Sequence, residues 1–435
     1  MSARKLAAEL LMQREKTEGY SNILLDAALE RSDLDARDKK FCSALYYGVL
    51  ERQLTLDHII KKYSKKPPEK LDNAVLQILR TGLYQLLFME HIPDTAAVSE
   101  SVKLTKKFRK ASASGFVNAV MRSFLRDGKK IEYPKESFEK LSVMYSVPVW
   151  LVKRLCESLG EKAACDFFSD ALEPPPLTIR RNPLVISEEE LLSGLSKYGI
   201  EKHSCIPDAY ILTKGGNVRN DAVFKKGGFH VQDTASQLCA MALDAKEGMT
   251  VLDLCAAPGG KTFTVAELMN GKGKVYAFDL FPKRAGLIEK GAERLHLENV
   301  TAQAGDASIY NGELPMADRV LCDVPCSGTG VIRRKPEIRY KSEEEIADLP
   351  GIQKKILENA AKYVKTGGIL LYSTCTVLKE ENEQIADGFL KEHPEFEPVP
   401  LLPSVDEKLS GSMITLLPSY FGSDGFFMAK FRRIK

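Results

Sequence analysis

The stretch VLDLCAAPGGKT, residues 251–262, decides the fold of this chain. An apolar run typical of a buried strand passes directly into an Ala-Pro-Gly-Gly turn, and a helix-forming segment follows. Glycines let the backbone approach a ligand closely, and open α/β sheets bind ligands at the carboxyl ends of their strands. A turn shaped by packing alone is the alternative. We expect the first strand of a doubly wound sheet, with a ligand-binding loop at its end.

Strands and helices alternate from about Val231 to the end of the chain. The strand-like runs are KVYAFDL (274–280), VTAQAGD (300–306), ADRVLCD (317–323) and GGILLYSTC (367–375). Helix-like segments separate them, so the pattern predicts a parallel, Rossmann-like α/β domain over residues 236–435. The last two runs, MITLLP and GFFMAKFRR, predict an antiparallel pair at the edge of that sheet.

The sequence before this domain divides into three parts. Residues 1–130 are predicted to be all-α, because segments such as NAVLQILRTGLYQLLF carry apolar residues at three- and four-residue spacing. Residues 131–173 predict a helical linker. Three prolines at 174–176 then break the chain, and LTIRRNPLVI begins a small α/β segment predicted over residues 174–235. The fold class is therefore multidomain, with an all-α region followed by α/β regions.

The composition excludes several classes of protein. The chain has 435 residues, a formal charge of +3 and nine cysteines. No two cysteines have CxxC spacing, so we expect reduced thiols, with neither a disulfide framework nor a zinc site. No apolar run approaches the roughly 18 residues that cross a bilayer, and the first segment, MSARKLAAELLMQREK, is charged throughout, unlike a signal peptide. We expect a monomeric, cytoplasmic protein without a bound metal or a membrane partner.

The strongest charge asymmetry lies between Ser101 and Lys130, where nine Lys or Arg accompany one acid, Asp127. A basic helical face of this kind is either a solvated surface or a nucleic-acid contact. Because the net charge is small, affinity for nucleic acid has to come from such local patches. The candidate contacts in this segment are Lys103, Lys106, Lys107, Arg109 and Lys110.

The loop at residues 255–262 excludes two common ligands. Gly260, Lys261 and Thr262 match the end of a phosphate-binding loop, GxxxxGK[ST], but Cys255 stands where its first glycine is required. The dinucleotide pattern GxGxxG is also missing, so NAD and FAD are disfavoured.

Aspartates end four successive strand-like runs, namely Asp253, Asp279, Asp306 and Asp323. A single aspartate at such a position is more often a helix cap than a ligand. The four aspartates together favour a nucleoside as the ligand. Asp279 is placed to accept hydrogen bonds from ribose hydroxyls, and Asp306 is placed to reach an adenine.

Two cysteines differ from the others because each lies where a strand gives way to a polar loop. They are Cys326 in LCDVPCSGTG and Cys375 in YSTCT, and we expect both thiols at the ligand-binding edge of the sheet. Small buried hydrophobes are the prediction for Cys42, Cys156, Cys165, Cys239 and Cys322. A free thiol with a pKa of about 8.5 is only a few per cent ionised at pH 7, so a nucleophile needs activation. Lys261 is placed to supply positive charge.

Two thiols beside a nucleoside site suit methylation at carbon 5 of a pyrimidine. That carbon is a poor nucleophile until a thiolate adds at carbon 6, and a second group must then assist release of the product. Asp323 is placed to hydrogen-bond the N3 edge of cytosine and so to discriminate against uracil. The residues alone leave open which thiol attacks.

The strings CAAPGGKT, DVPCSGTGVIRRKP, YSTCT followed by ENE, DGFFMAKF and FHVQDTAS resemble those of a known family. They are similar to the RNA 5-methylcytosine methyltransferases of the RsmB/NOP family, in particular to the RsmB (Sun/Fmu) subfamily. The basic helical region 1–130 resembles the NusB-like RNA-binding domain of that subfamily. The resemblance therefore spans nearly the whole chain, and it implies a class I methyltransferase fold that uses S-adenosylmethionine.

The resemblance also implies roles for individual residues. It makes Cys375 the nucleophile and Cys326 the group that assists product release, whereas DNA cytosine methyltransferases attack with the cysteine of their Pro-Cys motif. It implies 16S ribosomal RNA of the small subunit as the substrate. The cofactor contacts that it implies are Cys255, Ala256, Ala257, Pro258, Gly259, Gly260, Lys261, Asp279, Asp306 and Asp323.

Five further basic residues are candidates for contacts with RNA phosphates. Arg333, Arg334 and Lys335 follow the Pro-Cys motif and are placed to hold phosphates beside a flipped cytosine. Arg180 and Arg181 could extend that track. The alternative for each of them is an exposed, solvated charge.

Two rival functions compete with RNA methylation. A non-catalytic RNA-binding or ribosome assembly factor with a relic methyltransferase fold would bind the cofactor without transferring methyl groups, and the presence of both thiols, Asp323 and the glycine turn disfavours it. A protein or small-molecule methyltransferase usually carries an Asn-Pro-Pro-Tyr type motif or lacks paired cysteines, so it fits DVPC and STC poorly.

Overall fold

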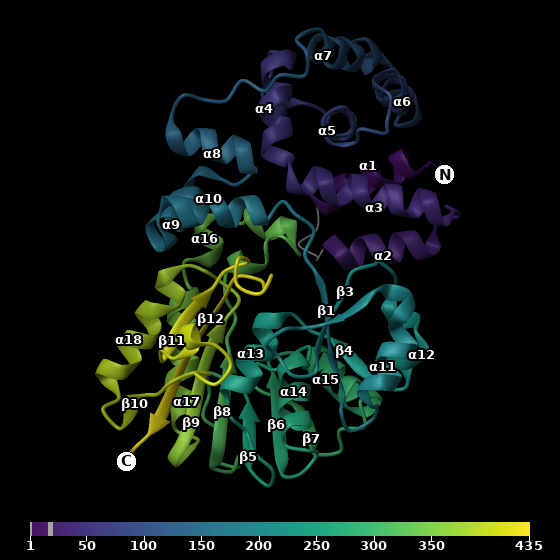
Figure 1. Cartoon of the computed structure of the whole chain (residues 1–435). Coiled ribbons are helices and arrows are strands. Elements are labelled where there is room, and N and C mark those ends of the chain that lie inside the picture. Colours follow the sequence, from purple (N-terminus) through teal and green to yellow (C-terminus); the bar gives the residue numbers. More distant parts are fainter. Residues whose placement is uncertain (1, 16–20) are drawn as a thin grey trace. The chain divides into compact units, whose positions relative to one another are not determined.

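The computed structural model describes residues 2–15 and 21–435. The chain forms two compact units, one made of Met1–Glu173 with Ile332–Lys341 and the other of Pro174–Val331 with Ser342–Lys435. Figure 1 labels their helices and strands. None of the helices in the described part of the chain is long and apolar enough to cross a membrane.

The first unit is helical, which confirms the prediction from apolar spacing. Helix α5 packs against α1, α3, α4, α6 and α7, because apolar side chains cover nearly all of its sides. Asp72 caps α5 by accepting hydrogen bonds from the backbone N–H groups of Ala74 and Val75. The helices of this unit are α1 (Ala3–Arg14), α2 (Ser21–Arg31), α3 (Ala36–Glu51), α4 (Gln53–Ser64), α5 (Asn73–Phe88), α6 (Asp94–Lys107), α7 (Ser114–Arg126), α8 (Ser137–Tyr145), α9 (Val149–Leu159) and α10 (Glu161–Asp170).

A short segment from the later part of the chain, Ile332–Lys341, folds with this helical unit. Arg339 is fully buried and donates hydrogen bonds to the carbonyl oxygens of Glu51 at 2.9 Å and of Tyr145 at 3.3 Å. The hydroxyl of Tyr340 donates to the carbonyl of Leu50 at 2.6 Å. Buried backbone acceptors thus find donors on this segment, which anchors it.

The second unit contains the predicted Rossmann-like sheet. Its strand order is β10-β12-β9-β8-β5-β6-β7, with β11 paired to β12. Strands β5 to β9 run parallel, whereas β12 is antiparallel to β9, β10 and β11. The predicted antiparallel pair is therefore confirmed, and β10 extends the sheet beyond it. The strands are β5 (Thr250–Asp253), β6 (Lys274–Asp279), β7 (Val300–Ala304), β8 (Ala317–Asp323), β9 (Val364–Thr374), β10 (Phe396–Pro398), β11 (Met413–Leu416) and β12 (Phe426–Arg433).

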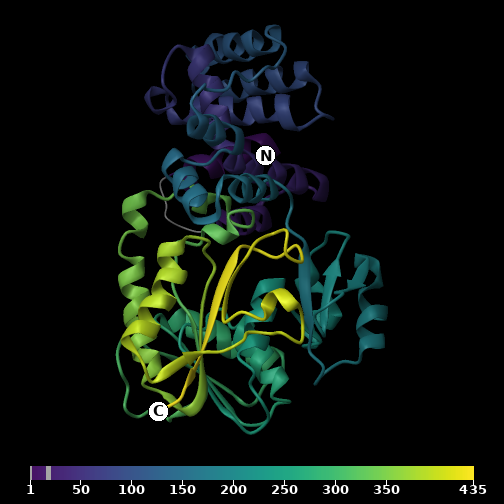
Figure 2. The same cartoon turned by 60° about the vertical axis from the view of Figure 1, so that its left-hand side comes forward.

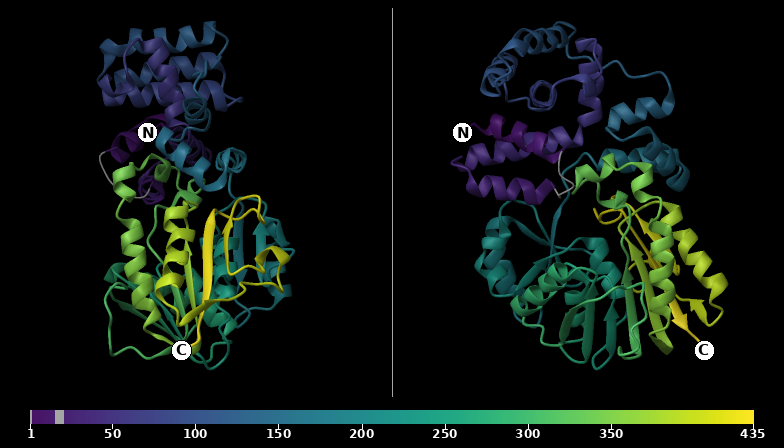
Figure 3. Two further views of the ribbon diagram at one scale, coloured as in Figure 1. Left: turned by 90° about the vertical axis from the view of Figure 1, so that its left-hand side faces the viewer. Right: turned by 180° about the vertical axis from the view of Figure 1, so that it is seen from behind.

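Successive residues of each strand belong to opposite faces of the sheet, and both faces are covered by helices. Val251 and Leu371 lie in the cluster beneath α13, α14 and α15, whereas Leu252 and Leu370 lie in the cluster beneath α17 and α18. Figures 2 and 3 show these two helical layers with the sheet between them. The helices of this unit that pack on the sheet are α13 (Thr234–Ala242), α14 (Gly260–Leu268), α15 (Pro282–Arg294), α17 (Leu349–Ala361) and α18 (Glu383–Glu392), and the short α16 (Glu343–Ile346) precedes α17.

A smaller antiparallel sheet precedes the large one within the second unit. Its strand order is β2-β3-β1-β4, and its apolar core includes Ile179, Leu191 and Tyr210. The elements are β1 (Leu177–Arg181), α11 (Glu188–Leu195), β2 (Ile200–Lys202), β3 (Ala209–Leu212), α12 (Ala222–Lys225) and β4 (Phe229–Val231).

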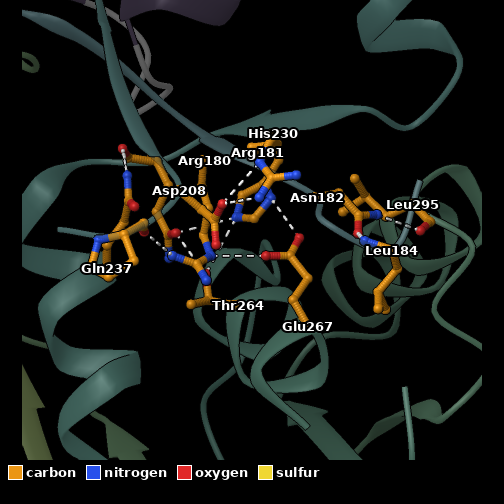
Figure 4. Close-up of polar contacts among 12 residues, drawn as sticks. Arg180, Arg181, Asn182, Leu184, Asp208, His230, Gln237, Thr264, Glu267 and Leu295 are labelled. Carbon is orange, nitrogen blue, oxygen red and sulfur yellow. Dashed lines mark hydrogen bonds and ion pairs between the residues drawn. The ribbon is translucent and has the colours of Figure 1, made fainter. Parts of the chain in front are cut away.

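A buried polar network joins this small sheet to α14, as Figure 4 shows. The guanidinium Nε of Arg180 lies 2.8 Å from Oε2 of Glu267, and the two side chains are 2% and 0% exposed. His230 Nδ1 lies 3.4 Å from the other oxygen of Glu267. A phosphate contact is therefore the wrong prediction for Arg180, because its charge is already paired inside the protein. Arg181 is partly buried and donates from Nε to Asp208 at 2.8 Å.

Replacing Arg180 with Met is expected to destabilise the second unit by about 3–5 kcal/mol, because Glu267 is left charged and buried without its partner. The double variant R180M/E267L should recover most of that loss, since both charges are then absent. Calorimetric unfolding of the full chain measures both effects. Lys272→Met, which breaks an exposed pair with Glu247, serves as the control and should change stability little. Equal losses in the single and the double variants would contradict the assignment.

Candidate active site

The loop between β5 and α14 is held in a conformation that requires glycine. Gly259 has a φ of +109°, and a Cβ atom there would lie 2.3 Å from the ring of Phe263. The backbone N–H of Ala256 donates to the carbonyl of Phe278 at 2.7 Å, which ties the loop to the end of β6. The predicted ligand-binding loop therefore lies at the carboxyl edge of the sheet with its backbone fixed in place.

Asp253, the last residue of β5, leaves one acceptor open beneath this loop. The hydroxyl of Thr262 donates to Oδ2 of Asp253 at 2.6 Å, whereas the buried Oδ1 has no hydrogen-bond partner. Burial raises the pKa of this carboxyl to about 7, against the opposing effect of the Thr262 hydrogen bond. A buried carboxylate oxygen without a partner suits a ligand that brings an N–H donor or a positive charge.

The structure places Asp279 and Asp306 at the ends of the next two strands. Asp279 is buried, accepts from the backbone N–H of Phe281 at 3.1 Å and lies 3.3 Å from Arg284. Asp306 is exposed and accepts from the N–H and hydroxyl groups of Ser308, which lower its pKa. Both carboxylates therefore already accept hydrogen bonds within local turns, neither caps a helix, and each keeps further acceptor capacity.

The two thiols meet because their strands are parallel neighbours. Asp323 in β8 is paired in register with Ser373 in β9, and each chain then turns over the same edge of the sheet. The sulfur atoms of Cys326 and Cys375 consequently lie 3.2 Å apart. The backbone N–H of Gly330 also donates to the carbonyl of Cys375 at 3.0 Å. The structure thus brings together the two cysteines that the sequence singled out.

Lys261 and Asp323 form an ion pair beside the thiols. Nζ of Lys261 lies 2.7 Å from Oδ2 of Asp323, and the hydroxyl of Ser373 donates to Oδ1 at 2.9 Å. Burial alone would lower the pKa of Lys261, but the charges of Asp323 and of the thiols Cys239 and Cys375 raise it above its ordinary value. Lys261 therefore stays protonated, and its positive charge is close enough to Cys375 for the two to interact electrostatically.

The two thiols do not have the same electrostatic surroundings. The hydrogen bond with Cys375 raises the pKa of Cys326 most, and burial, the charge of Cys375 and the charge of Glu381 raise it further. These effects favour the protonated form of Cys326, and either sulfur can be the donor in the S–H···S contact.

The remaining cysteines differ in burial, from exposed Cys205 and half-buried Cys255 to fully buried ones. Cys42, Cys239 and Cys322 are buried, as expected for small hydrophobes, whereas Cys156 and Cys165 are only half-buried. No cysteine in the described part of the chain forms a disulfide. Residues 2–15 and 21–435 also contain no cluster of His, Cys, Asp and Glu that could hold a metal ion.

The candidate RNA contacts of the helical unit lie where α6 ends. Lys106, Lys107 and Arg109 are exposed. Lys103 and Lys110 form ion pairs with Glu100 at 2.8 Å and with Asp72 at 2.6 Å. Arg333, Arg334 and Lys335 lie in the Ile332–Lys341 segment, which folds with the helical unit.

Sequence reasoning missed two residues of the site. The hydroxyl of Ser373 orients the carboxylate of Asp323. The only feature of the sequence that pointed to Ser373 was its position two residues before Cys375. Glu381 is buried and accepts a hydrogen bond from the residue that follows Cys326. The string ENE at residues 381–383 pointed to Glu381. The sequence does not show which groups Glu381 contacts, however, so it assigned this residue no role.

Three family models match this chain in succession. Residues 1–126 match the NusB family, residues 147–219 match the ferredoxin-like domain of RsmF/B-like methyltransferases, and residues 240–432 match the 16S rRNA methyltransferase RsmB/F. The chain is 39% identical to the "Probable ribosomal RNA small subunit methyltransferase B" of Bacillus subtilis (strain 168), over 99% of both chains. The chain belongs to the RsmB/F methyltransferase family. A protein with the same description in Synechocystis sp. is 33% identical over 100% of both chains.

The fold of a solved structure agrees with this family assignment. The crystal structure of PH0851 has a TM-score of 0.84 to this chain at 29% identity and covers 100% of this chain and 99% of that one. The predicted class I fold after a NusB-like domain is thus confirmed.

S-adenosylmethionine is the cofactor of this methyltransferase family. The described residues fit such a ligand, because the open Oδ1 of Asp253 can accept a hydrogen bond from its amino group. The other predicted cofactor residues, Cys255 to Lys261 with Asp279, Asp306 and Asp323, surround the same carboxyl edge of the sheet.

Replacing Lys261 with Met is expected to slow alkylation of Cys375 by iodoacetamide at pH 7 about tenfold, because the thiolate loses a nearby positive charge that stabilises it. Asp323→Asn should move the pH profile of alkylation in the opposite direction, since it leaves the charge of Lys261 unopposed. Peptide mass spectrometry identifies the alkylated cysteine, and Lys272→Met is the control for an exposed lysine. Identical profiles in both variants would show that the ion pair does not act on Cys375.

Proposed function

We propose that this chain methylates carbon 5 of a cytosine in 16S ribosomal RNA, through a covalent adduct with Cys375. The observation that carries the proposal is the 3.2 Å separation of two thiols at the carboxyl edge of a methyltransferase sheet, beside the Lys261–Asp323 ion pair. A single thiol would suffice to attack a pyrimidine, but release of the product calls for a second group.

The attack starts from the thiolate of Cys375. Its sulfur forms a bond to carbon 6 of cytosine, and the electron pair of the C5–C6 double bond moves to carbon 5. When bound, S-adenosylmethionine would supply an electrophilic methyl group on a sulfonium: carbon 5 would form a bond to that methyl carbon, and the S–CH3 bond would break to leave the neutral thioether S-adenosylhomocysteine. A base removes the proton from carbon 5, the double bond re-forms, and Cys375 leaves as a thiolate. Lys261 stabilises the thiolate at both the first and the last step.

Asp323 is proposed to hydrogen-bond the base, and Cys326 is proposed to assist the sulfur that leaves it. Asp323, oriented by Lys261 and Ser373, accepts a hydrogen bond from N3, which is protonated in the cytosine adduct, and so stabilises that adduct. Cys326 keeps its proton next to Cys375 and assists the departure of that sulfur.

The RNA substrate is supported by the named relatives and by the basic residues. The relatives in Bacillus subtilis and Synechocystis are both described as "Probable ribosomal RNA small subunit methyltransferase B". A cytosine in RNA has to be unpaired or flipped to reach a thiol, and exposed Lys106, Lys107 and Arg109 are available to hold the backbone. The rival reading, an assembly factor that binds RNA without methylating it, predicts cofactor binding with no adduct.

Replacement of the two cysteines is expected to impair different steps of the reaction. With a 16S ribosomal RNA fragment and S-adenosylmethionine, Cys375→Ser should abolish both the covalent band and turnover, because no nucleophile remains. Cys326→Ala should leave a covalent protein–RNA band that resolves slowly. Denaturing gels and bisulfite sequencing measure the adduct and the product. The reversed pattern would exchange the two roles, and no adduct in any variant would favour the assembly factor.

Affinity for the RNA is expected to fall steeply with salt, because phosphate contacts release counterions. Replacing Lys106, Lys107 and Arg109 with Ala should reduce the steepness of the log Kd against log salt plot by about 2 to 3, at close to one contact each. Lys272 and Lys354, which pair with Glu247 and Glu392 on the second unit, are the matched controls. If the slope of log Kd against log salt is unchanged in the triple variant, Lys106, Lys107 and Arg109 do not contact the RNA.

A further inference from the structure

A buried carboxylate connects the loops that carry the two thiols. Glu381 is 1% exposed and lies six residues after Cys375, in the turn that leads into α18. Its backbone carbonyl accepts from the hydroxyl of Tyr372 in β9 at 2.6 Å, which fixes the turn to the sheet. A carboxylate so deeply buried needs several donors to offset the loss of water.

On one side, Glu381 holds the loop of Cys326. Its Oε2 accepts from the backbone N–H of Ser327 at 2.8 Å and from Nε2 of Gln353 at 2.8 Å. The same amide of Gln353, which projects from α17, donates to the carbonyl of Pro325 at 3.0 Å. The residues immediately before and after Cys326 are therefore both tied to this one pair of side chains.

On the other side, Glu381 holds the loop of Cys375. Its Oε1 accepts from the hydroxyl of Thr376 at 3.2 Å. Oγ1 of Thr376 in turn receives the hydroxyl of Ser327 at 2.8 Å, and Oγ1 of Thr329 lies 2.8 Å away as well. Asn382 adds a hydrogen bond from its Nδ2 to the carbonyl of Thr376 at 3.0 Å.

The carboxylate also makes the two thiols unequal. Its negative charge is among the causes that raise the pKa of Cys326, whereas Lys261 interacts with Cys375. The negative charges of Glu381 and Asp323 therefore favour a proton on Cys326, and the positive charge of Lys261 favours a thiolate at Cys375. Sequence reasoning had no basis for this distinction, because it depends on which buried charge each loop contacts.

We propose that Glu381 is a positioning residue that fixes the two thiols against each other and assigns them their separate tasks. It binds the backbone beside Cys326 and the side chain beside Cys375, so that the S–H of Cys326 donates to the sulfur of Cys375. The inference rests on the proposed cytosine methylation and names a residue that acts through both thiols without touching the base.

Glu381→Gln tests the inference, because it keeps the size of the side chain, removes the charge and replaces one acceptor with a donor. The matched control is Glu383→Gln, a carboxylate of the same ENE string that accepts from Thr415 at 3.0 Å and makes no contact with either thiol loop in the described structure. Cofactor binding and the thermal transition of the full chain establish that each variant is folded.

Three outcomes are expected for Glu381→Gln. Iodoacetamide should label Cys326 at neutral pH at least about tenfold faster than in the wild type, since one unit of pKa changes the thiolate fraction tenfold. The covalent adduct should form more slowly at Cys375, and it should resolve with a pH profile shifted from that of the wild type. Glu383→Gln should match the wild type in all three measurements.

A second variant covers the case in which Glu381→Gln does not fold. Thr376→Val removes the hydroxyl that links Glu381 to the Cys375 loop and leaves the carboxylate in place. It should slow adduct formation while the labelling of Cys326 stays low, because the charge beside Cys326 remains. If the wild type methylates RNA but Glu381→Gln or Thr376→Val behaves like Glu383→Gln, the proposed role of Glu381 is wrong and the proposed function still stands. A wild type that forms no adduct would overturn the proposed function itself.

Discussion

Two parallel strands that end side by side are the constraint on which the site depends. In β8 and β9 the pairing of Asp323 with Ser373 fixes where each chain leaves the sheet, and the loops that follow carry Cys326 and Cys375 to a sulfur–sulfur distance of 3.2 Å. Parallel neighbours always present their carboxyl ends at the same edge, so short loops are enough to bring the two thiols together. Charges then distinguish them, with Lys261 acting on one thiol and Glu381 on the other.

The charged groups beneath the thiols are themselves held by the wider fold. Lys261 lies in the first turn of α14, and the same helix carries Glu267, whose carboxylate receives Arg180 from the small sheet. A shift of the small sheet against α14 would therefore move Lys261 relative to the thiols. Because the Arg180–Glu267 pair is fully buried, separating it is costly, and the small sheet serves as a rigid support for the cofactor helix.

The sequence alone was enough to predict the elements that show a local apolar period or a short motif. Alternating apolar runs predicted β5 to β9, and the glycine turn after Asp253 predicted the loop, because strand period and turn chemistry are properties of neighbouring residues. Long-range partners were not predictable in this way. Arg180 was placed on an RNA surface, since nothing near it in the sequence reveals Glu267, which lies 87 residues further on. Glu381 and the anchoring of Arg339 were missed for the same reason, because hydrogen-bond partners across the fold leave no periodic signal.

The central claim is that one cytosine meets both thiols and is attacked by Cys375. A 16S ribosomal RNA fragment that carries 5-fluorocytosine tests it most directly, because fluorine at carbon 5 cannot leave as a proton does and the adduct persists after methyl transfer. Mass spectrometry of the digested complex should find the methylated nucleotide on the peptide that contains Cys375. Attachment to Cys326, or the absence of any covalent product while ordinary RNA is methylated, would contradict the account.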